Sequence, residues 1–153
     1  MLNGLQKMEK ELVIESPDFP NGGTFPIKNT HRGEESSPEF ILKNLSPDCK
    51  TIAIIFDDLD HPMNHWLIWN IPAMSTIPGN LPKEAGLVNL GNAVQKTRYR
   101  GPNPHKGVRH KYQFNFYVLD CELKIKATSN KAALEKAMEG HIIQSGFIYG
   151  YFE

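Results

Sequence analysis

Prolines and glycines divide the chain into short apolar runs, and this punctuation constrains its fold more than any other feature. The 153 residues include 11 prolines and 12 glycines, which interrupt helices and favour turns. Between them stand runs rich in branched and aromatic residues, such as "TIAIIFDD" (residues 51–58) and "NHWLIWNIP" (residues 64–72). Short runs of this composition are typical of strands. The sequence therefore predicts a loop-rich, mainly β protein, and its length suits a single domain over residues 1–153.

One segment alternates cleanly, and another predicts a helix. In "KYQFNFYVLD" (residues 111–120) every second residue from Tyr112 is apolar, so one face of a strand should be buried. "KAALEKAMEGH" (residues 131–141) has an apolar stripe at helical spacing, with Asn130 to cap its start and Gly140 to end it. The aromatic residues expected in the core are Trp66, Trp69, Phe114 and Phe116. Further strands are predicted over residues 11–16, 40–45 and 142–153, and a short helical or frayed lead-in over residues 1–10.

Balanced charge limits the classes of partner. The chain carries 17 Lys and Arg against 17 Asp and Glu, so no overall basic field recruits nucleic acid or acidic lipid headgroups. Any anion must therefore be bound locally. Cys49 and Cys121 lie far apart and form neither a metal motif nor a disulfide framework. Because the sequence shows no apolar signal segment and no membrane-spanning run, we expect a soluble, cytoplasmic protein without stable membrane insertion.

Charged and imidazole groups gather where the first long apolar run ends. "DDLDHPMNHW" (residues 57–66) places three aspartates and two histidines within ten positions. One interpretation is a turn that simply solvates its carboxylates. In the other, a hairpin-like return brings Asp58, at the end of one strand, beside His65, at the start of the next. That arrangement would form one wall of a pocket.

A second polar group follows a loop rich in glycine and proline, "GPNPHKGVRHKY" (residues 101–112). His110 and Tyr112 are two apart in an extended stretch, so their side chains should point to the same face. The loop could also turn backbone N–H groups toward a ligand. Together with His65, these groups could donate several hydrogen bonds to one oxyanion. A solvated, charged loop is the alternative.

Two other chemistries could use the same residues. His65 and His110 with Asp58 or Asp60 could form a metal site with two histidines and one carboxylate. The same groups could also act as acid and base in a hydrolase. Nucleophilic hydrolysis is disfavoured, because the chain has no Gly-x-Ser-x-Gly elbow and neither cysteine is next to a histidine in sequence.

Five stretches occur in an informative order: "HRGEESSPEF", "DDLDHP", "NHWLIWNIP", "YRGPNPHKGVRHKYQFNFYVLD" and "AMEGHII". In this order they resemble the phosphatidylethanolamine-binding protein family, in its compact bacterial and archaeal branch. The family's Asp-Pro-Asp-Ala-Pro motif matches through Asp58, Asp60 and Pro62. The resemblance covers nearly the whole chain.

The resemblance implies an antiparallel Greek-key β-sandwich with a few short helices. It also implies a pocket for phosphate-like or carboxylate-like groups, phospholipid headgroups among them. The residues around this pocket would be Asp58, Asp60, His65, Gly101, Asn103, His110 and Tyr112. We expect no catalytic residue, no metal and no cofactor. The chain departs from the family pattern at Leu59, at His61, and at Lys111, which replaces an arginine and so removes a bidentate anion donor.

Asp58 is an unusual neighbour for a bound anion, since two like charges a few ångströms apart repel by about 1 to 4 kcal/mol. A monoprotonated phosphate could donate its hydroxyl to Asp58, or Asp58 could orient one histidine and keep it protonated. Both hypotheses predict binding that weakens as the pH rises from about 6 to 9. The tight return between Asp58 and His65 also leads us to predict a cis peptide bond at His61–Pro62.

We therefore predict a small soluble binding protein with an anion pocket, and not an enzyme. A protein-interaction module that inhibits a kinase or protease is the second interpretation, and a hydrolase that uses the Asp/His cluster is the third. A protein partner or a homodimer stays open, as does the physiological ligand. Strand register decides which of Tyr149 and Tyr151 faces the pocket.

Overall fold

The structure is a computed structural model that describes residues 11–153. This part of the chain contains two β-sheets and one α-helix. The strands are β1 (Val13–Glu15), β2 (Gly23–Thr24), β3 (Phe40–Lys43), β4 (Thr51–Asp58), β5 (Met63–Pro72), β6 (Thr76–Ile77), β7 (Gly86–Leu87), β8 (Val94–Gln95), β9 (His110–Leu119) and β10 (Ile142–Phe152). The helices are the 3₁₀ helix η1 (Ile27–Asn29) and the α-helix α2 (Lys131–Met138). This confirms the mainly β prediction, whereas the predicted lead-in over residues 1–10 lies outside the described residues.

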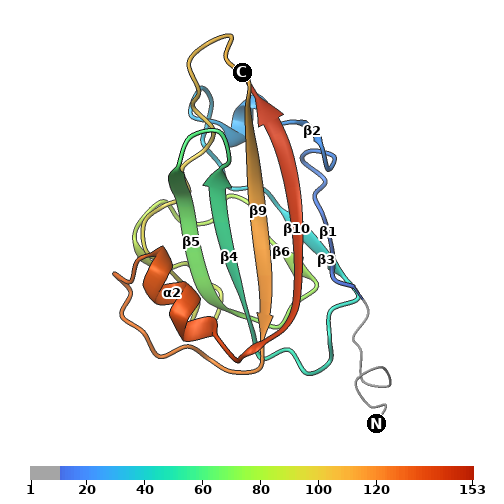
Figure 1. The fold of residues 1–153 in the computed structure, drawn as a ribbon, viewed down its shortest axis with the longest axis vertical. Coiled ribbons are helices and arrows are strands. Elements are labelled where there is room, and N and C mark those ends of the chain that lie inside the picture. The colour runs from blue at the N-terminus through green and yellow to red at the C-terminus, as the bar shows by residue number, and fades with distance from the viewer. Residues whose placement is uncertain (1–10) are drawn as a thin grey trace.

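The strands form one large and one small sheet. The large sheet has the strand order β2-β10-β9-β4-β5-β8-β7, and the small sheet has the order β1-β3-β6 (Figure 1). Neighbouring strands are antiparallel except for β2 and β10, which run parallel. The predicted antiparallel arrangement therefore holds for all pairs but that one.

The long strands form where the sequence alternates or stays apolar. In β9, Tyr112, Phe114 and Phe116 are buried, whereas Gln113 and Asn115 between them are half-buried. This is the alternation that the sequence predicts. By contrast, residues 51–56 of β4 are buried without interruption, because other elements cover both faces of this strand.

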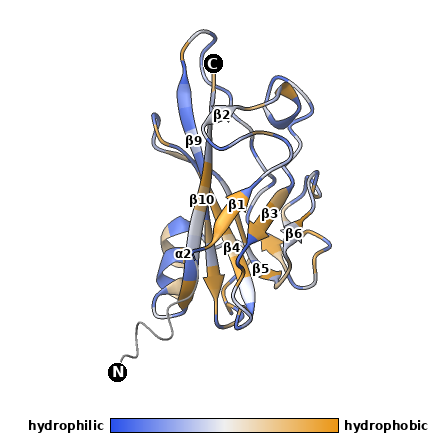
Figure 2. Ribbon diagram, turned by 90° about the vertical axis from the view of Figure 1, so that its right-hand side faces the viewer, coloured by the Kyte–Doolittle hydropathy of each residue, from blue (hydrophilic) through white to orange (hydrophobic). Residues whose placement is uncertain are grey.

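Apolar side chains pack on both faces of the large sheet, and Figure 2 shows the apolar strands β1 and β3 of the small sheet beside it. Between the sheets, Phe40 of β3 meets Phe114 and Phe116 of β9 at ring-centroid distances of 4.9 and 5.0 Å. On the other face, Leu134 of α2 packs in one cluster with Trp69 of β5. The strand aromatics are therefore core residues, as predicted.

The helix α2 begins where the sequence predicts. The Asn130 side chain accepts a hydrogen bond from the backbone N–H of Ala133 at 2.9 Å and so caps the helix. Past its end, Gly140 adopts φ +79°, a conformation that favours glycine. The Lys131 ammonium lies 3.0 Å from the Asp57 carboxylate, which ties the helix to the end of β4. Between residues 11 and 153, no helix is both long and apolar enough to cross a membrane.

Three neighbouring strands bring the polar segments together at one end of the large sheet. β4 ends at Asp58, which pairs with Met63 of β5 and with Tyr112 of β9. His65 lies two residues further along β5, and His110 begins β9. Two segments separated by about 45 positions in sequence therefore meet at the end of the sheet near the C-terminus (Figure 1).

Candidate functional site

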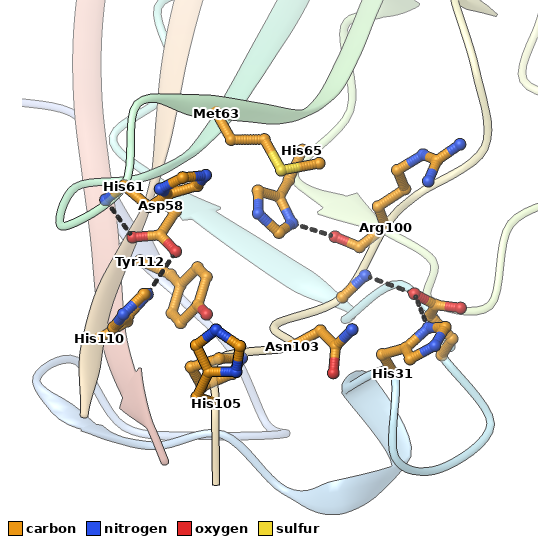
Figure 3. A pocket seen from close by; sticks show the side chains of 13 residues that line it. His31, Asp58, His61, Met63, His65, Arg100, Asn103, His105, His110 and Tyr112 are labelled. Carbon is orange, nitrogen blue, oxygen red and sulfur yellow. Dashed lines mark hydrogen bonds and ion pairs between the residues drawn. The ribbon is translucent and has the colours of Figure 1, made fainter. Parts of the chain in front are cut away.

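A pocket of about 300 Å³ opens at this end of the sheet (Figure 3). Five of the six histidines of the chain line it, namely His31, His61, His65, His105 and His110. Other lining residues are Glu35, Asp58, Arg100, Gly101, Asn103 and Tyr112. The wall therefore combines several imidazoles with a phenol and two carboxylates.

Asp58 is buried, with 6% of its surface exposed, and its carboxylate accepts three hydrogen bonds. One oxygen accepts from the backbone N–H groups of Asp60 at 2.8 Å and His61 at 3.0 Å, and the other from His110 Nδ1 at 2.7 Å. The first two bonds close the turn between β4 and β5. None of the peptide bonds that the structure describes is cis, so the predicted cis bond at His61–Pro62 is wrong. The Asp58 side chain reverses the backbone locally and makes a cis bond unnecessary.

His65 is held in one tautomer. Its Nδ1 lies 3.0 Å from the carbonyl oxygen of Arg100, which can only accept, so Nδ1 carries the proton. Burial lowers the pKa of His65 and outweighs the opposing effects of the Arg100 carbonyl and Asp58. Near neutral pH the ring is therefore uncharged, and its Nε2 can accept a hydrogen bond.

Tyr112 lies fully buried at the base of the pocket. Its ring meets the His65 ring edge-on at a centroid distance of 5.5 Å. The hydroxyl has no hydrogen-bond partner within the described part of the chain. Burial, followed by the nearby Asp58 carboxylate, raises the pKa of Tyr112 well above its ordinary value. The hydroxyl therefore stays protonated, as a donor close to the Asp58 carboxylate.

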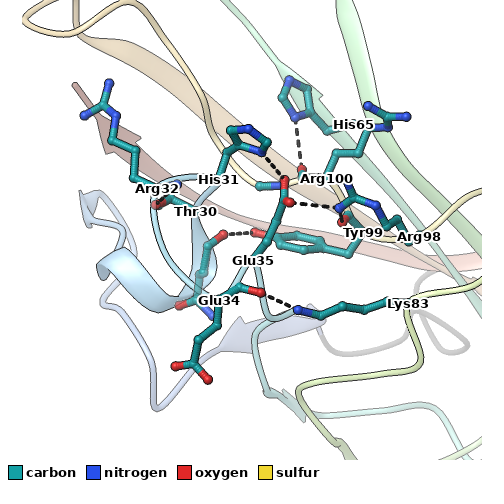
Figure 4. Close-up of polar contacts among 12 residues, drawn as sticks. Thr30, His31, Arg32, Glu34, Glu35, His65, Lys83, Arg98, Tyr99 and Arg100 are labelled. Atoms are coloured by element: carbon teal, nitrogen blue, oxygen red, sulfur yellow. Dashed lines mark hydrogen bonds and ion pairs between the residues drawn. The ribbon is translucent and has the colours of Figure 1, made fainter.

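Glu35 holds the segment around Gly101, which lines one side of the pocket (Figure 4). Its carboxylate accepts hydrogen bonds from the Gly101 N–H at 3.0 Å and the Arg98 guanidinium at 2.9 Å, and lies 3.2 Å from His31 Nδ1. Glu35 adopts φ +56°, which is unusual for a residue other than glycine. Burial alone would raise the pKa of Glu35, but the hydrogen bonds from Arg98, Gly101 and His31 together lower it. A charged carboxylate therefore anchors this segment.

Most of the residues predicted around the pocket do line it: Asp58, His65, Gly101, Asn103, His110 and Tyr112. Asp60 is not part of the lining, and its carboxylate instead accepts the Lys111 backbone N–H at 2.6 Å. Tyr149 and Tyr151 do not line it either. They lie beside Lys111 and Arg109, at 4.2 and 3.9 Å from cation to ring centroid.

The predicted set omitted several lining residues: His31, Glu35, His61, Arg100 and His105. His61, Arg100 and His105 could have been found because they stand in or beside the two polar segments, whereas His31 stands in neither. Glu35 carried no such signal, since its contacts with Arg98 and Gly101 join positions more than 60 residues apart.

Comparison with known proteins adds independent information. The family model described as phosphatidylethanolamine-binding protein matches residues 15–153. A UPF0098 protein of Archaeoglobus fulgidus is 39% identical over 96% of this chain, and the match spans 53% of that relative, about half its length. The crystal structure of CT736 from Chlamydia trachomatis, described as a putative phosphatidylethanolamine-binding protein homologue, matches with a TM-score of 0.79 and 26% identity over 94% of this chain and 97% of that chain. Escherichia coli YbcL shares the fold, with a TM-score of 0.83 and 22% identity over 94% of this chain and 99% of that chain.

Proposed function

The chain belongs to the phosphatidylethanolamine-binding protein family, and we propose that its histidine-lined pocket binds a small phosphate-like or carboxylate-like anion. The observation that carries this proposal is the gathering of five of the six histidines around one pocket. Imidazole N–H groups donate hydrogen bonds to oxyanions, and the ring becomes a cation close to neutral pH. Free phosphate and a phospholipid headgroup are two sources of the same chemistry.

Asp58 acts on the anion through His110. Because its carboxylate already accepts three hydrogen bonds from the protein, it has little capacity left for a proton on the ligand. Its carboxylate can only accept a hydrogen bond from His110 Nδ1, and this bond of 2.7 Å holds the ring in place. The ring is held so that Nε2, where it carries a proton, can donate to the ligand, and Asp58 thereby positions a donor instead of only repelling the anion.

His65 acts as a hydrogen-bond acceptor for the ligand and not as a donor. Its Nδ1 proton is taken by the Arg100 carbonyl, so in the neutral ring Nε2 is an acceptor. A monoprotonated phosphate suits this group, because its hydroxyl can donate to His65 while its other oxygens accept from His110 and the Tyr112 hydroxyl. Loss of the ligand proton, or of the protons that imidazoles gain below neutral pH, breaks this match. Affinity should therefore fall as the pH rises from about 6 to 9.

The same geometry supports binding without turnover. Within residues 11–153, the side chains that line the pocket include no serine, threonine, cysteine or lysine, so none of these nucleophiles is found there. The two carboxylates, Asp58 and Glu35, are each occupied by donors of the protein. Neither is free to activate water as a general base.

The test is calorimetric titration of phosphate, and separately of phosphoethanolamine, into the metal-free protein at about pH 6.5, where histidines titrate. We expect saturable binding to the wild type and its loss in His65→Ala. The matched control is His141→Ala, which removes the one histidine outside the pocket and should bind as the wild type does. Circular dichroism checks that each variant is folded. Failure of the folded wild type to bind either anion, or wild-type affinity in His65→Ala, would refute the proposal.

A further inference from the structure

Three potential metal ligands meet at the other end of the large sheet. Asp120 and Cys121 follow the last residue of β9, and His141 directly precedes β10. One ligand atom of each, namely a carboxylate oxygen, a thiol sulfur and an imidazole nitrogen, lies within 4.8 Å of the other two. In residues 11–153 no other group of three or more His, Cys, Asp or Glu side chains is so arranged. This Asp120–Cys121–His141 cluster stands about 30 Å from the pocket, since the ten steps from His110 to Asp120 each advance about 3.3 Å (Figure 1).

The backbone fixes the cluster in place. The Asp120 N–H donates to the His141 carbonyl at 3.0 Å, which extends the pairing of β9 with β10 by one step. The Thr51 hydroxyl donates to the Cys121 carbonyl at 2.7 Å and ties the same residues to the start of β4. The His141 N–H donates to the Met138 carbonyl at 3.0 Å, at the end of α2. Hydrogen bonds to the start of β4, to the end of α2 and between the ends of β9 and β10 therefore hold the backbone of the three ligand residues.

We propose that Asp120, Cys121 and His141 bind a divalent transition metal ion of the zinc type, with solvent in the fourth position. Thiolate, imidazole and carboxylate are the three side-chain ligands that zinc uses in proteins. The sulfur and nitrogen ligands disfavour magnesium and calcium, which take oxygen ligands. Three protein ligands leave one position open, so the site is accessible to solvent or to a further ligand.

The three ligand atoms, which all lie within 4.8 Å of one another, would have to adjust their spacing around this ion. Tetrahedral zinc, with bonds of about 2.0 to 2.3 Å, requires ligand atoms about 3.3 to 3.6 Å apart. His141 Nδ1 and the Asp120 carboxylate are 2.8 Å apart, so this pair must open by about half an ångström. Both side chains are nearly half exposed, at 46% and 47%, so they can move at low cost. The ion pair that the metal replaces is a surface pair, which contributes little to stability.

A nucleophilic role for Cys121 fits the surroundings less well. Burial, and then the adjacent Asp120 carboxylate, raise the pKa of the Cys121 thiol. Reactive cysteines instead lie near cations that lower their pKa.

Cobalt(II) provides the direct test, because a cobalt–thiolate bond gives a near-ultraviolet charge-transfer band that other ligands do not produce. Cobalt chloride is titrated into the reduced, metal-free full chain, and zinc affinity is then measured by competition with a chromophoric chelator. The variants are Cys121→Ser and His141→Ala. The matched controls are Cys49→Ala, which removes the buried thiol elsewhere, and His65→Ala, which removes an imidazole from the pocket.

We expect the band in the wild type, in Cys49→Ala and in His65→Ala, and its absence in Cys121→Ser. His141→Ala should weaken zinc binding by about tenfold or more. The proposal is overturned by absence of the band from the reduced wild type, by its persistence in Cys121→Ser, or by equal loss of zinc affinity in His65→Ala and His141→Ala. Phosphate binding is measured on metal-free protein, so the anion pocket and the metal site can succeed or fail independently.

Discussion

The substitution Asp58→Asn separates two roles for the buried carboxylate by the sign of its effect. If Asp58 merely repels a bound anion, removal of its charge should tighten phosphate binding by about 1 to 4 kcal/mol for charges about 4 Å apart. If Asp58 holds His110 in position to donate to the anion, the same substitution should weaken binding. The hydrogen bonds of the pocket favour the second outcome.

The geometry also sets the size of the effect. The amide oxygen of asparagine can still accept from the Asp60 and His61 N–H groups, so the turn between β4 and β5 should persist. The amide nitrogen then faces His110 Nδ1, which must become an acceptor, so the hydrogen bond from Nδ1 to a charged carboxylate that holds this ring is lost. A hydrogen bond to a charged group contributes about 1.5 to 3 kcal/mol. The dissociation constant for phosphate should therefore rise by about 10- to 100-fold.

Calorimetry at about pH 6.5 measures this change, with thermal unfolding as the check on folding. Asp60→Asn is the matched control, because it removes a nearby carboxylate whose hydrogen bond goes to the Lys111 backbone N–H and not to a pocket imidazole. It should leave the dissociation constant nearly unchanged. Tighter binding in both variants would show that the carboxylates act only by repulsion, and the role assigned to the Asp58–His110 pair would then be wrong.

Three further substitutions test how the pocket and the helix are held. Glu35→Gln should weaken phosphate binding and lower thermal stability at neutral pH, because the segment around Gly101 loses a charged acceptor. The pKa of Glu35 is lowered, so its contribution is present above the ordinary value of 4.5 and is lost as the pH falls through the lowered value. Thermal melts of both proteins should therefore converge in acid, and a constant difference would contradict this assignment. Gly101→Ala should lower the free energy of unfolding by about 1 to 3 kcal/mol, because the added Cβ meets the backbone of Asn29 and Thr30. Urea unfolding measures this loss, and wild-type stability would disprove the close approach. Asn130→Ala should lower the free energy of unfolding by about 1 kcal/mol through loss of the helix cap. Phosphate affinity should stay unchanged in Asn130→Ala, and calorimetry that showed a loss would mean that α2 supports the pocket.

Long strands could be predicted from the sequence because their burial repeats over many residues. The alternation from Tyr112 to Val118 in β9 is an example, since its period alone identifies the buried face. The two-residue strands β2, β6, β7 and β8 could not be predicted, because two residues carry no period. In β8, Gln95 is buried because its amide accepts from the Trp66 indole and donates to the carbonyls of Pro82 and Glu84. Such long-range pairing leaves no local pattern.

The candidate site likewise contains residues that could be predicted from long strands and a residue that could not. Asp58, His65, His110 and Tyr112 stand at the ends of long strands, so their positions follow once the strands are paired. Glu35 reaches the pocket from a loop, and its conformation depends on the Gly101 N–H, which lies 66 positions away in sequence. The cis bond was predicted from chain reversal alone. That argument omitted the Asp58 side chain, which makes the turn without it.

The cluster "DDLDHP" shows that turn chemistry and pocket chemistry were never alternatives. Asp58 closes the turn with one carboxylate oxygen and holds His110 with the other. Asp60 accepts the Lys111 N–H, and the Leu59 N–H donates to the Lys111 carbonyl, so the same turn is fastened to β9 beside His110. A change that loosened this turn would therefore also displace His110. This coupling explains how two aspartates of a matched family motif are compatible with the proposed anion site: their charges are used within the protein, and the donors that they position are left for a ligand.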